Sequence, residues 1–245
     1  VSYEVTEKTL QTLKEMLMEK IGYANRSSLS LKEGMIDYSK IKCELEKVKY
    51  GLREDVEAND NFIQPIAIAV IISEDGEKIL CVKKTKKSTA ASSPEFGQTL
   101  LYVGGHMRCE DSTVKCKNFL DVLRNTLERE LYEELGISFS LNHKREPFVI
   151  YTPNSNKSRK HLAIGWVIKL SEGSKLRLDS YELIQKKGKS KSGTFIPFQN
   201  ITDPDVSLES WSRTILLNIF SNKLSESQKA LIQTPTPEQL TIIES

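Results

Sequence analysis

Residues 129–137 read RELYEELGI, and this stretch decides how the rest of the chain is interpreted. It ends a segment in which leucines recur at steps of three and four residues, at Leu120, Leu123, Leu127, Leu131 and Leu135. That spacing places the leucines on one face of a helix, and the Gly136 that follows them is a usual helix terminator. The sequence therefore predicts a helix from about residue 118 to residue 135, with one face packed on a core.

Three glutamates stand beside the leucine face of this predicted helix: Glu130, Glu133 and Glu134. At spacings of three and four residues their carboxylates project from neighbouring turns and repel one another by roughly a few tenths of a kcal/mol per pair. Acids near the carboxyl end of a helix also oppose its dipole. A hard divalent cation such as Mg²⁺ offsets both costs, because it binds carboxylate oxygens. Glutamates are also common on solvated helix faces, so the triplet alone is compatible with an ordinary surface.

The first sixty residues show helical periodicity. One apolar stripe holds Leu10, Leu13, Leu17 and Ile21, and a second holds Tyr38, Ile41, Leu45 and Val48. These stripes predict a helical extension over residues 1–60, which ends in a polar joint at residues 55–61.

From Pro65 onward the pattern changes to that of strands. Strands are predicted at residues 66–72, 79–82, 100–103, 148–151 and 162–170, with Gly104 and Gly105 ending the third of them. A basic turn at residues 154–161 joins the last two, and a final apolar helix is expected at residues 208–220. Strands and helices are mixed without a regular alternation, which favours an α+β fold with a mixed β-sheet sandwiched by helices. We expect this domain to span residues 61–232 and to be followed by a loosely ordered tail at residues 233–245.

Composition and charge narrow the classes of function. The chain is 38% hydrophobic and 28% charged, as expected for a globular protein, and its longest apolar stretch is far too short to span a membrane. The beginning of the sequence lacks the layout of a secretory signal and the four cysteines form no CxxC pair, so we expect a cytoplasmic protein with reduced thiols. A net charge of +2 gives no strong nucleic-acid signal. Local clusters of lysine and arginine instead suit a small anionic ligand.

Residues 129–137, taken with the strand, the two glycines and the loop before them, resemble the Nudix box. That motif has a glycine, five residues, a glutamate, seven residues, and then Arg-Glu-aliphatic-x-Glu-Glu-x-Gly-aliphatic. Residues 129–137 match its second half at every specified position. The resemblance covers about residues 65–170, including the order of strands. Gly104-Gly105-His106 is similar to the start of the box in a branch often labelled phosphoesterase, and residues 158–163 and 208–212 show weaker similarity to that branch.

The chain departs from the motif in one place. The first glycine of the usual box lies fourteen positions before the arginine, whereas Gly105 precedes Arg129 by twenty-four, so about ten residues are inserted. Counting forward from Gly105 places Asp111 at the position of the front glutamate, and counting back from Arg129 places Asp121 there. The sequence leaves this choice open. An insertion in a loop costs little free energy, because loop-closure entropy grows slowly with length.

The resemblance implies a metal site and its chemistry. Glu130, Glu133 and Glu134 would bind Mg²⁺, with Mn²⁺ as the alternative, and one of them would also serve as the base that activates water. Arg129 would orient Glu130 or its neighbours, and the carbonyl oxygen of Gly105 or of Gly104 would join the metal ligands. Expected contacts to substrate phosphate are made by residues outside the triplet, namely His106, Arg159 and His161. Weaker candidates for a remote base are Glu172, Asp179, Glu182 and Glu209, and for base stacking Tyr102, Trp166 and Trp211, although tryptophan is more often a core residue.

The function predicted from these residues is metal-dependent hydrolysis of the pyrophosphate bond in a nucleoside diphosphate derivative or a related organic pyrophosphate. The partner would be a small phosphorylated molecule, in the first place a nucleotide. The alternative is a catalytically inactive Nudix regulator that senses a nucleotide, although inactive members usually lose box glutamates. A diphosphate isomerase on the same fold lacks a cysteine in a suitable context. The helical front would also allow two subunits to pair as a homodimer.

Overall fold

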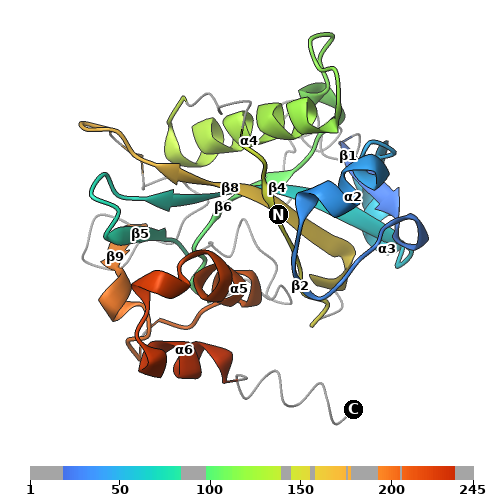
Figure 1. The fold of residues 1–245 in the computed structure, drawn as a ribbon. Helices are drawn as coiled ribbons and strands as arrows, with labels where there is room; N and C mark the ends of the chain where they lie inside the picture. The colour runs from blue at the N-terminus through green and yellow to red at the C-terminus, as the bar shows by residue number, and fades with distance from the viewer. Residues whose placement is uncertain are drawn as a thin grey trace, which may run out of the picture.

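The computed structural model describes residues 19–83, 98–138, 145–154, 158–174, 176–177, 193–204 and 206–234. Figure 1 shows its elements. The strands are β1 (Lys20–Asn25), β2 (Gly34–Ile36), β3 (Lys49–Leu52), β4 (Phe62–Ile72), β5 (Lys78–Cys81), β6 (Val103–His106), β7 (Phe148–Tyr151), β8 (His161–Lys169) and β9 (Thr194–Pro197). The α-helices are α2 (Tyr38–Leu45), α3 (Arg53–Ala58), α4 (Phe119–Leu135), α5 (Ser210–Ile219) and α6 (Glu226–Gln233). Short 3₁₀ turns include η2 (Cys109–Asp111) and η3 (Ser158–Lys160).

The centre of the sheet is the parallel pair β4 and β8. Their register runs from Gln64 opposite His161 to Ile72 opposite Lys169. Nearly all of β4 is buried, which suits a strand that is covered on both faces and is therefore apolar throughout. The second edge of β8 pairs with β7, which in turn pairs with β2. The second edge of β4 pairs along its length with β1, β6 and β5.

Helices cover both faces of this sheet. Helix α4 lies on one face, and α5 with α6 lies on the other (Figure 1). The leucine stripe of α4 is fully buried at Leu123, Leu127, Leu131 and Leu135. The side chain of Asn118 caps the start of the helix and Gly136, with φ of 66°, ends it, so the predicted helix is confirmed. The predicted α+β class, with a mixed sheet between helices, is also confirmed.

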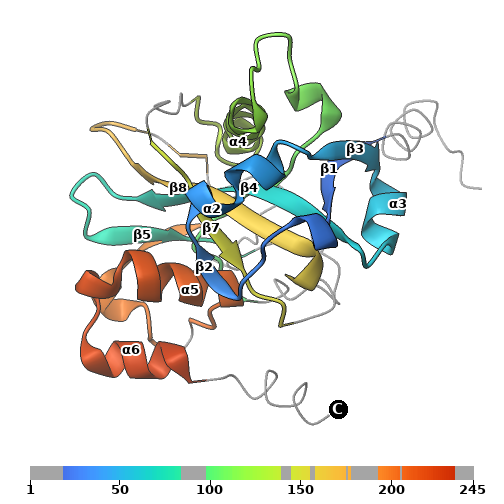
Figure 2. The same cartoon turned by 45° about the vertical axis from the view of Figure 1, so that its right-hand side comes forward.

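The expected helical character of residues 1–60 is right for α2 and α3 and wrong for β1, β2 and β3. Ile21, which the sequence placed on a helical stripe, lies fully buried in β1. That strand pairs with β3 and, where Ala24 stands opposite Ile63, with β4. Figure 2 shows β1, β3 and α3 at the opposite end of the sheet from β5. Pairing with partners distant in sequence overrides a local periodicity that contains no information about them. The predicted boundary at residue 60 therefore falls between paired strands of one sheet. The stripe residues before Ile21 lie outside the described residues, and the expected joint at residues 55–61 begins within α3.

The expected strand at residues 100–103 is displaced. Strand β6 begins at Val103 and includes both glycines that were expected to end it, with Gly104 opposite Ile68 and Gly105 opposite Ala67. Gly104 has a φ of 142°, and a Cβ there would collide with the carbonyl oxygen of Ala67. The glycines therefore continue the strand, because only a residue without a side chain can adopt this conformation at such close approach.

The remaining strand and helix predictions hold to within one or two residues at β5, β7, β8 and α5. Strand β9 and helix α6 were not predicted. Both are short, and β9 depends on pairing with β5, which is more than a hundred residues earlier in the chain. Of the predicted tail at residues 233–245, Gln233 instead ends α6, and the residues from 235 onward lie outside the described part of the chain. Among the described helices, none is both long enough and apolar enough to cross a membrane.

Candidate functional site

The last two turns of α4 place the three glutamates in two different environments. Glu130 and Glu134, one turn apart, have only 7% and 1% of their surface exposed. The side chain of Glu133 is 41% exposed. Burying two carboxylates within one helical turn is costly, and an ordinary solvated helix face does not require it. The arrangement therefore calls for a specific partner or function.

Gly105 of β6 lies directly beneath the carboxylate of Glu130. A Cβ added to Gly105 would stand 2.5 Å from Oε1 and 2.8 Å from Oε2 of Glu130. The carboxylate therefore occupies space that any other residue at position 105 would fill. Through this contact the strand backbone and the acidic end of α4 approach one another at a point free of side chains.

Arg129 joins the acidic residues into one network. Its Nη1 donates hydrogen bonds to Glu130 Oε1 at 2.6 Å and to Glu133 Oε2 at 3.2 Å. Its Nη2 donates to the carbonyl oxygen of His106 at 3.0 Å. Its Nε and Nη2 hold both oxygens of Asp111 at 2.8 and 3.0 Å. Such a two-point arginine–carboxylate pair is geometrically specific, so Arg129 is fixed against both the strand end and the helix.

The structure distinguishes the two aspartates that the sequence left open. Asp111 is 6% exposed and also accepts hydrogen bonds from the backbone N–H of Arg108 and the hydroxyl of Thr126, both at 2.8 Å. Asp121 instead lies in the first turn of α4, where it accepts from the backbone of Lys117 and pairs with Arg124. Asp111 thus holds the arginine of the box. The inserted residues follow it, in the loop that projects beside the start of α4 (Figure 2).

Asp111→Asn is expected to lower the free energy of unfolding by about 3 kcal/mol, because Arg129 would lose the charge of its buried partner. Asp121→Asn is the matched control on the other side of the insertion. There we expect about 1 kcal/mol or less, since the loss is confined to the charge at a helix start and one i,i+3 pair. Urea denaturation of both variants measures the difference. Equal losses would contradict the assignment of Asp111 to the network.

The electrostatic environment moves Asp111 and Glu130 in opposite directions. Burial raises the pKa of Asp111, but the hydrogen bonds and charge of Arg129 outweigh it and hold that pKa below its usual value. For Glu130, burial is the largest effect and raises its pKa, although the charge and hydrogen bond of Arg129 oppose it. The charged form of Glu130 is therefore destabilised in the folded protein, and a bound cation would relieve this cost.

The raised pKa of Glu130 predicts a pH-dependent stability. The folded protein binds a proton on Glu130 more tightly than the unfolded chain, whose value is about 4.3. Stability therefore falls as pH rises from there through the folded pKa. Without divalent cations, Glu130→Gln is expected to gain stability relative to the unsubstituted protein between about pH 4.5 and pH 7.5. Urea denaturation in a chelating buffer at both values measures this, and a difference independent of pH would contradict it.

The residue types at this site fit a hard divalent cation. Carboxylate oxygens are the ligands that Mg²⁺ prefers, and the space over Gly105 admits them close to the strand backbone. Within the described part of the chain, no three His, Cys, Asp or Glu side chains already converge as a metal site. Arg129 is the nearest counter-charge of Glu130 and Glu133 in this arrangement.

Two of the three residues expected to contact substrate lie together. The rings of His106 and His161 meet edge to face, with centroids 5.5 Å apart. His106 Nε2 is 2.9 Å from Oε1 of Gln64. Gln64 is 1% exposed and lies in the otherwise apolar strand β4, and no sequence motif predicted a site residue at this position. Arg159 is directed elsewhere, because its Nη2 donates to Asp60 at 2.8 Å. Neighbouring residues on a strand point to opposite faces, so His106 lies on the sheet face away from Glu130.

Other candidates from the sequence have structural roles or lie outside the described residues. Glu209 is 3% exposed and caps α5, accepting hydrogen bonds from the backbone of Trp211 and Ser212. Tyr102 donates to the same carboxylate and packs against Trp211. Trp166 is also buried. Glu172 lies in an exposed turn. Asp179, Glu182 and most of the basic clusters are outside the described residues.

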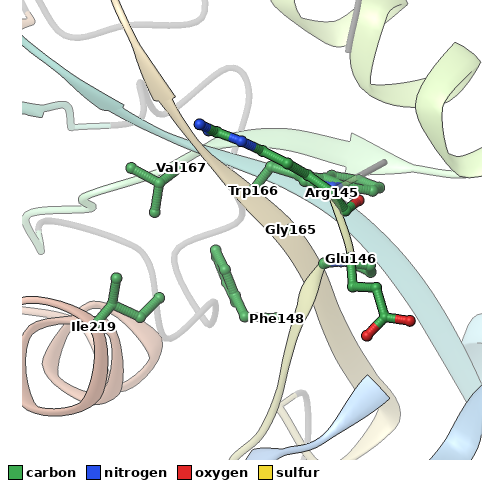
Figure 3. Close-up of a pocket in the computed structure, with 8 residues that line it drawn as sticks. Arg145, Glu146, Phe148, Gly165, Trp166, Val167 and Ile219 are labelled. Carbon is green, nitrogen blue, oxygen red and sulfur yellow. Dashed lines mark hydrogen bonds between the residues drawn. The ribbon is translucent and has the colours of Figure 1, made fainter. Parts of the chain in front are cut away.

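A cavity of about 390 Å³ lies between the sheet and α5. Phe148 and Val167 extend from the sheet toward Ile219 of α5, and the carboxylate of Glu146 points away from them (Figure 3). Gly165 lines the cavity and pairs with Ile68 of β4. Gly105 pairs with Ala67, the neighbour of Ile68, and neighbouring residues of a strand point to opposite faces. The cavity is therefore on the sheet face opposite the glutamates, and it does not belong to their site.

Comparison with known proteins identifies the fold. The sequence matches no protein-family model and no curated protein. The crystal structure of Tm1382, a protein assigned to the Nudix hydrolases, is similar with a TM-score of 0.58 and 20% identity over 82% of this chain and 100% of that chain. The MutT protein of Methanosarcina mazei Go1 gives a TM-score of 0.42 and 18% identity over 66% of this chain and 96% of that one. A bifunctional NMN adenylyltransferase/ADP ribose pyrophosphatase from Francisella tularensis gives 0.42 and 19%, over 66% of this chain and 42% of that chain.

The similarity to Tm1382 extends over most of both chains and concerns the arrangement of strands and helices. The mixed sheet, the strand that carries Gly104 and Gly105, and the glutamate-rich end of α4 were the features from which this arrangement was predicted. This chain has the fold of the Nudix hydrolases.

Proposed function

We propose that this protein is a divalent-metal-dependent hydrolase that cleaves the pyrophosphate bond of a nucleoside diphosphate derivative or a related organic pyrophosphate. The observation that carries the proposal is the burial of Glu130 and Glu134 one helical turn apart, with the carboxylate of Glu130 set over the bare backbone of Gly105. A scaffold that only had to fold would gain stability by replacing these carboxylates with apolar side chains.

The acidic residues at the end of α4 and the residues that hold them in place would have different roles in the reaction. Glu130, Glu133 and Glu134 supply anionic oxygens at the end of α4. Arg129 fixes Glu130, and Asp111 fixes Arg129, so the position of the acids is coupled to the end of β6. Bound Mg²⁺ or Mn²⁺ would neutralise phosphoryl oxygens, orient a water for in-line attack and stabilise the leaving group. His106 and His161 stay candidates for contact with substrate, although His106 lies on the face of the sheet away from Glu130.

The test is turnover of a broad panel of organic pyrophosphates with Mg²⁺ or Mn²⁺, with products identified by mass spectrometry. We expect release of two phosphorylated products from at least one nucleoside diphosphate derivative, and roughly a thousandfold slower release by Glu134→Gln. Absence of turnover across the panel would contradict the proposal. Tight nucleotide binding without turnover would favour the sensing regulator instead.

A further inference from the structure

Arg108 lies beside Glu133, at the edge of the acidic site formed by Glu130, Glu133 and Glu134. It belongs to the loop that leaves β6. Its Nη1 is 3.5 Å from Oε1 of Glu133, and its Nε donates to Oε1 of Glu19 at 2.9 Å. Its backbone N–H is bound to Asp111. The side chain is 36% exposed, so it is reachable from solvent at the same edge as Glu133. Nothing in the local sequence around Arg108 marks it as a site residue.

Glu19 holds this arginine from behind. Its two oxygens are divided between Arg108 and Arg53, each at 2.9 Å, and its side chain is 18% exposed. Burial raises the pKa of Glu19, but hydrogen bonds and charges from Arg53 and Arg108 outweigh it and leave that pKa lowered. Glu19 is therefore charged at neutral pH. The backbone is also tied here, since the N–H of Gly22 in β1 donates to the carbonyl oxygen of Met107 at 2.9 Å.

The guanidinium of Arg108 keeps donor capacity for a ligand. Its contact with Glu133 is at the outer limit of a hydrogen bond, and its Nη2 bonds to no described residue. An arginine fixed through Nε presents its two terminal nitrogens as a planar fork that matches the oxygens of a phosphate. It lies three positions after Gly105, whose backbone borders Glu130. A diphosphate bound at the glutamates would therefore bring its negative oxygens to this fork.

We propose that Arg108 binds a phosphate oxygen of the diphosphate substrate, and that Glu19 is the positioning residue that aims it. The inference rests on the proposed function and deepens it. The segment before β4 then belongs to the site itself, because it carries Glu19. On binding, Arg108 exchanges its weak contact with Glu133 for a charge-assisted bond to phosphate.

The experiment measures binding of methylenediphosphonate, which carries the charge of a diphosphate but has an uncleavable P–C–P link and no base. Calorimetry with Mg²⁺ present is expected to show roughly 10- to 100-fold weaker binding for Arg108→Ala. Arg108→Lys should recover part of the loss, because a lysine keeps the charge and loses the fork. Glu19→Gln should weaken binding severalfold.

Arg53→Ala is the matched control. Arg53 shares Glu19 with Arg108 and is similarly exposed, at 40%, but its second partner is Glu57 and not Glu133. We expect its affinity for the diphosphonate to stay within about twofold of the unsubstituted protein, since it makes no contact with the phosphate-binding fork. An equal loss in Arg53→Ala would show that removing either arginine of this cluster weakens binding, so that Arg108 has no specific part in holding phosphate, and would overturn the proposal.

Binding of Mn²⁺ alone, followed by electron paramagnetic resonance, separates the phosphate role from a structural one. Arg108→Ala is expected to bind Mn²⁺ as tightly as the unsubstituted protein or more tightly, because a positive neighbour of Glu133 is removed. Weakened Mn²⁺ binding would indicate a disturbed site and overturn the inference.

If the protein hydrolyses a pyrophosphate but Arg108→Ala binds the diphosphonate normally, the inference fails and the proposed function stands. If turnover is absent but binding of the diphosphonate depends on Arg108, the proposed function fails and the role of Arg108 in binding a diphosphate stands.

Discussion

Replacing Glu134 with glutamine is expected to lower kcat roughly a thousandfold, which corresponds to about 4 kcal/mol of transition-state stabilisation. Glu134 is 1% exposed, so water from the solvent could not take over the role of a lost carboxylate oxygen at this position. Glutamine has nearly the same shape and leaves the packing of α4 intact, but it removes a negative oxygen from the set that would hold the cation. The loss should therefore appear in kcat and in Mn²⁺ affinity while the fold is retained.

Glu128→Gln is the control for this prediction. Glu128 lies on the same helix and undergoes the same change, but it is not one of the three glutamates of the box. Steady-state kinetics on the substrate identified by the panel, with circular dichroism to check folding, would compare the two variants. We expect Glu128→Gln to keep most of the activity. Full activity in Glu134→Gln would rule out its part in the chemistry.

Gly105→Ala is expected to reduce kcat by about a hundredfold, because the new Cβ would stand 2.5 Å from the carboxylate of Glu130. The carboxylate would have to move by about an ångström, and a displacement of that size is enough for such a loss. Overpacking should also cost about 1–3 kcal/mol of folding free energy. Gly105 lies in β6, which is paired with β4, and Glu130 is a buried residue of α4, so neither can move away easily.

Gly22→Ala is the matched glycine substitution. Gly22 lies in β1, and a Cβ there would stand 3.3 Å from its nearest neighbours, the side chains of Met107 and Val48. These side chains need to yield only by a few tenths of an ångström. We expect activity within about threefold of the unsubstituted protein, since the acidic residues are untouched. Kinetics and thermal denaturation of both variants measure the contrast. Normal activity in Gly105→Ala would contradict a catalytic need for the close approach of Gly105 and the Glu130 carboxylate.

Local sequence was sufficient to predict α4, because its information lies within about two dozen residues. The leucine period predicts the buried face, Asn118 and Gly136 mark its ends, and the three glutamates follow from the same spacing. The apolar run at residues 66–72 likewise predicts a strand, although β4 begins four residues earlier, at Phe62. These features depend on propensity and period, which a single segment contains in full.

Only the tertiary structure decided which residues meet across the sheet and the loops. Counting positions could not choose between Asp111 and Asp121, because an insertion changes separation along the chain without fixing which end of the loop turns back to Arg129. The helical pattern of residues 1–60 fails at β1 to β3, because the hydrogen-bonding partners of these strands lie elsewhere in the chain. The placement of Glu19 behind Arg108 joins residues almost ninety positions apart.

The box sequence RELYEELGI therefore determined the helix, its buried face and the spacing of its acids. The structure decided that Glu130 lies over Gly105, that Asp111 holds Arg129, and that the segment before β4 reaches the same edge. The physical reason is the range of the interactions. Helical period and capping act over a few residues, whereas strand pairing and buried ion pairs depend on segments brought together by the fold.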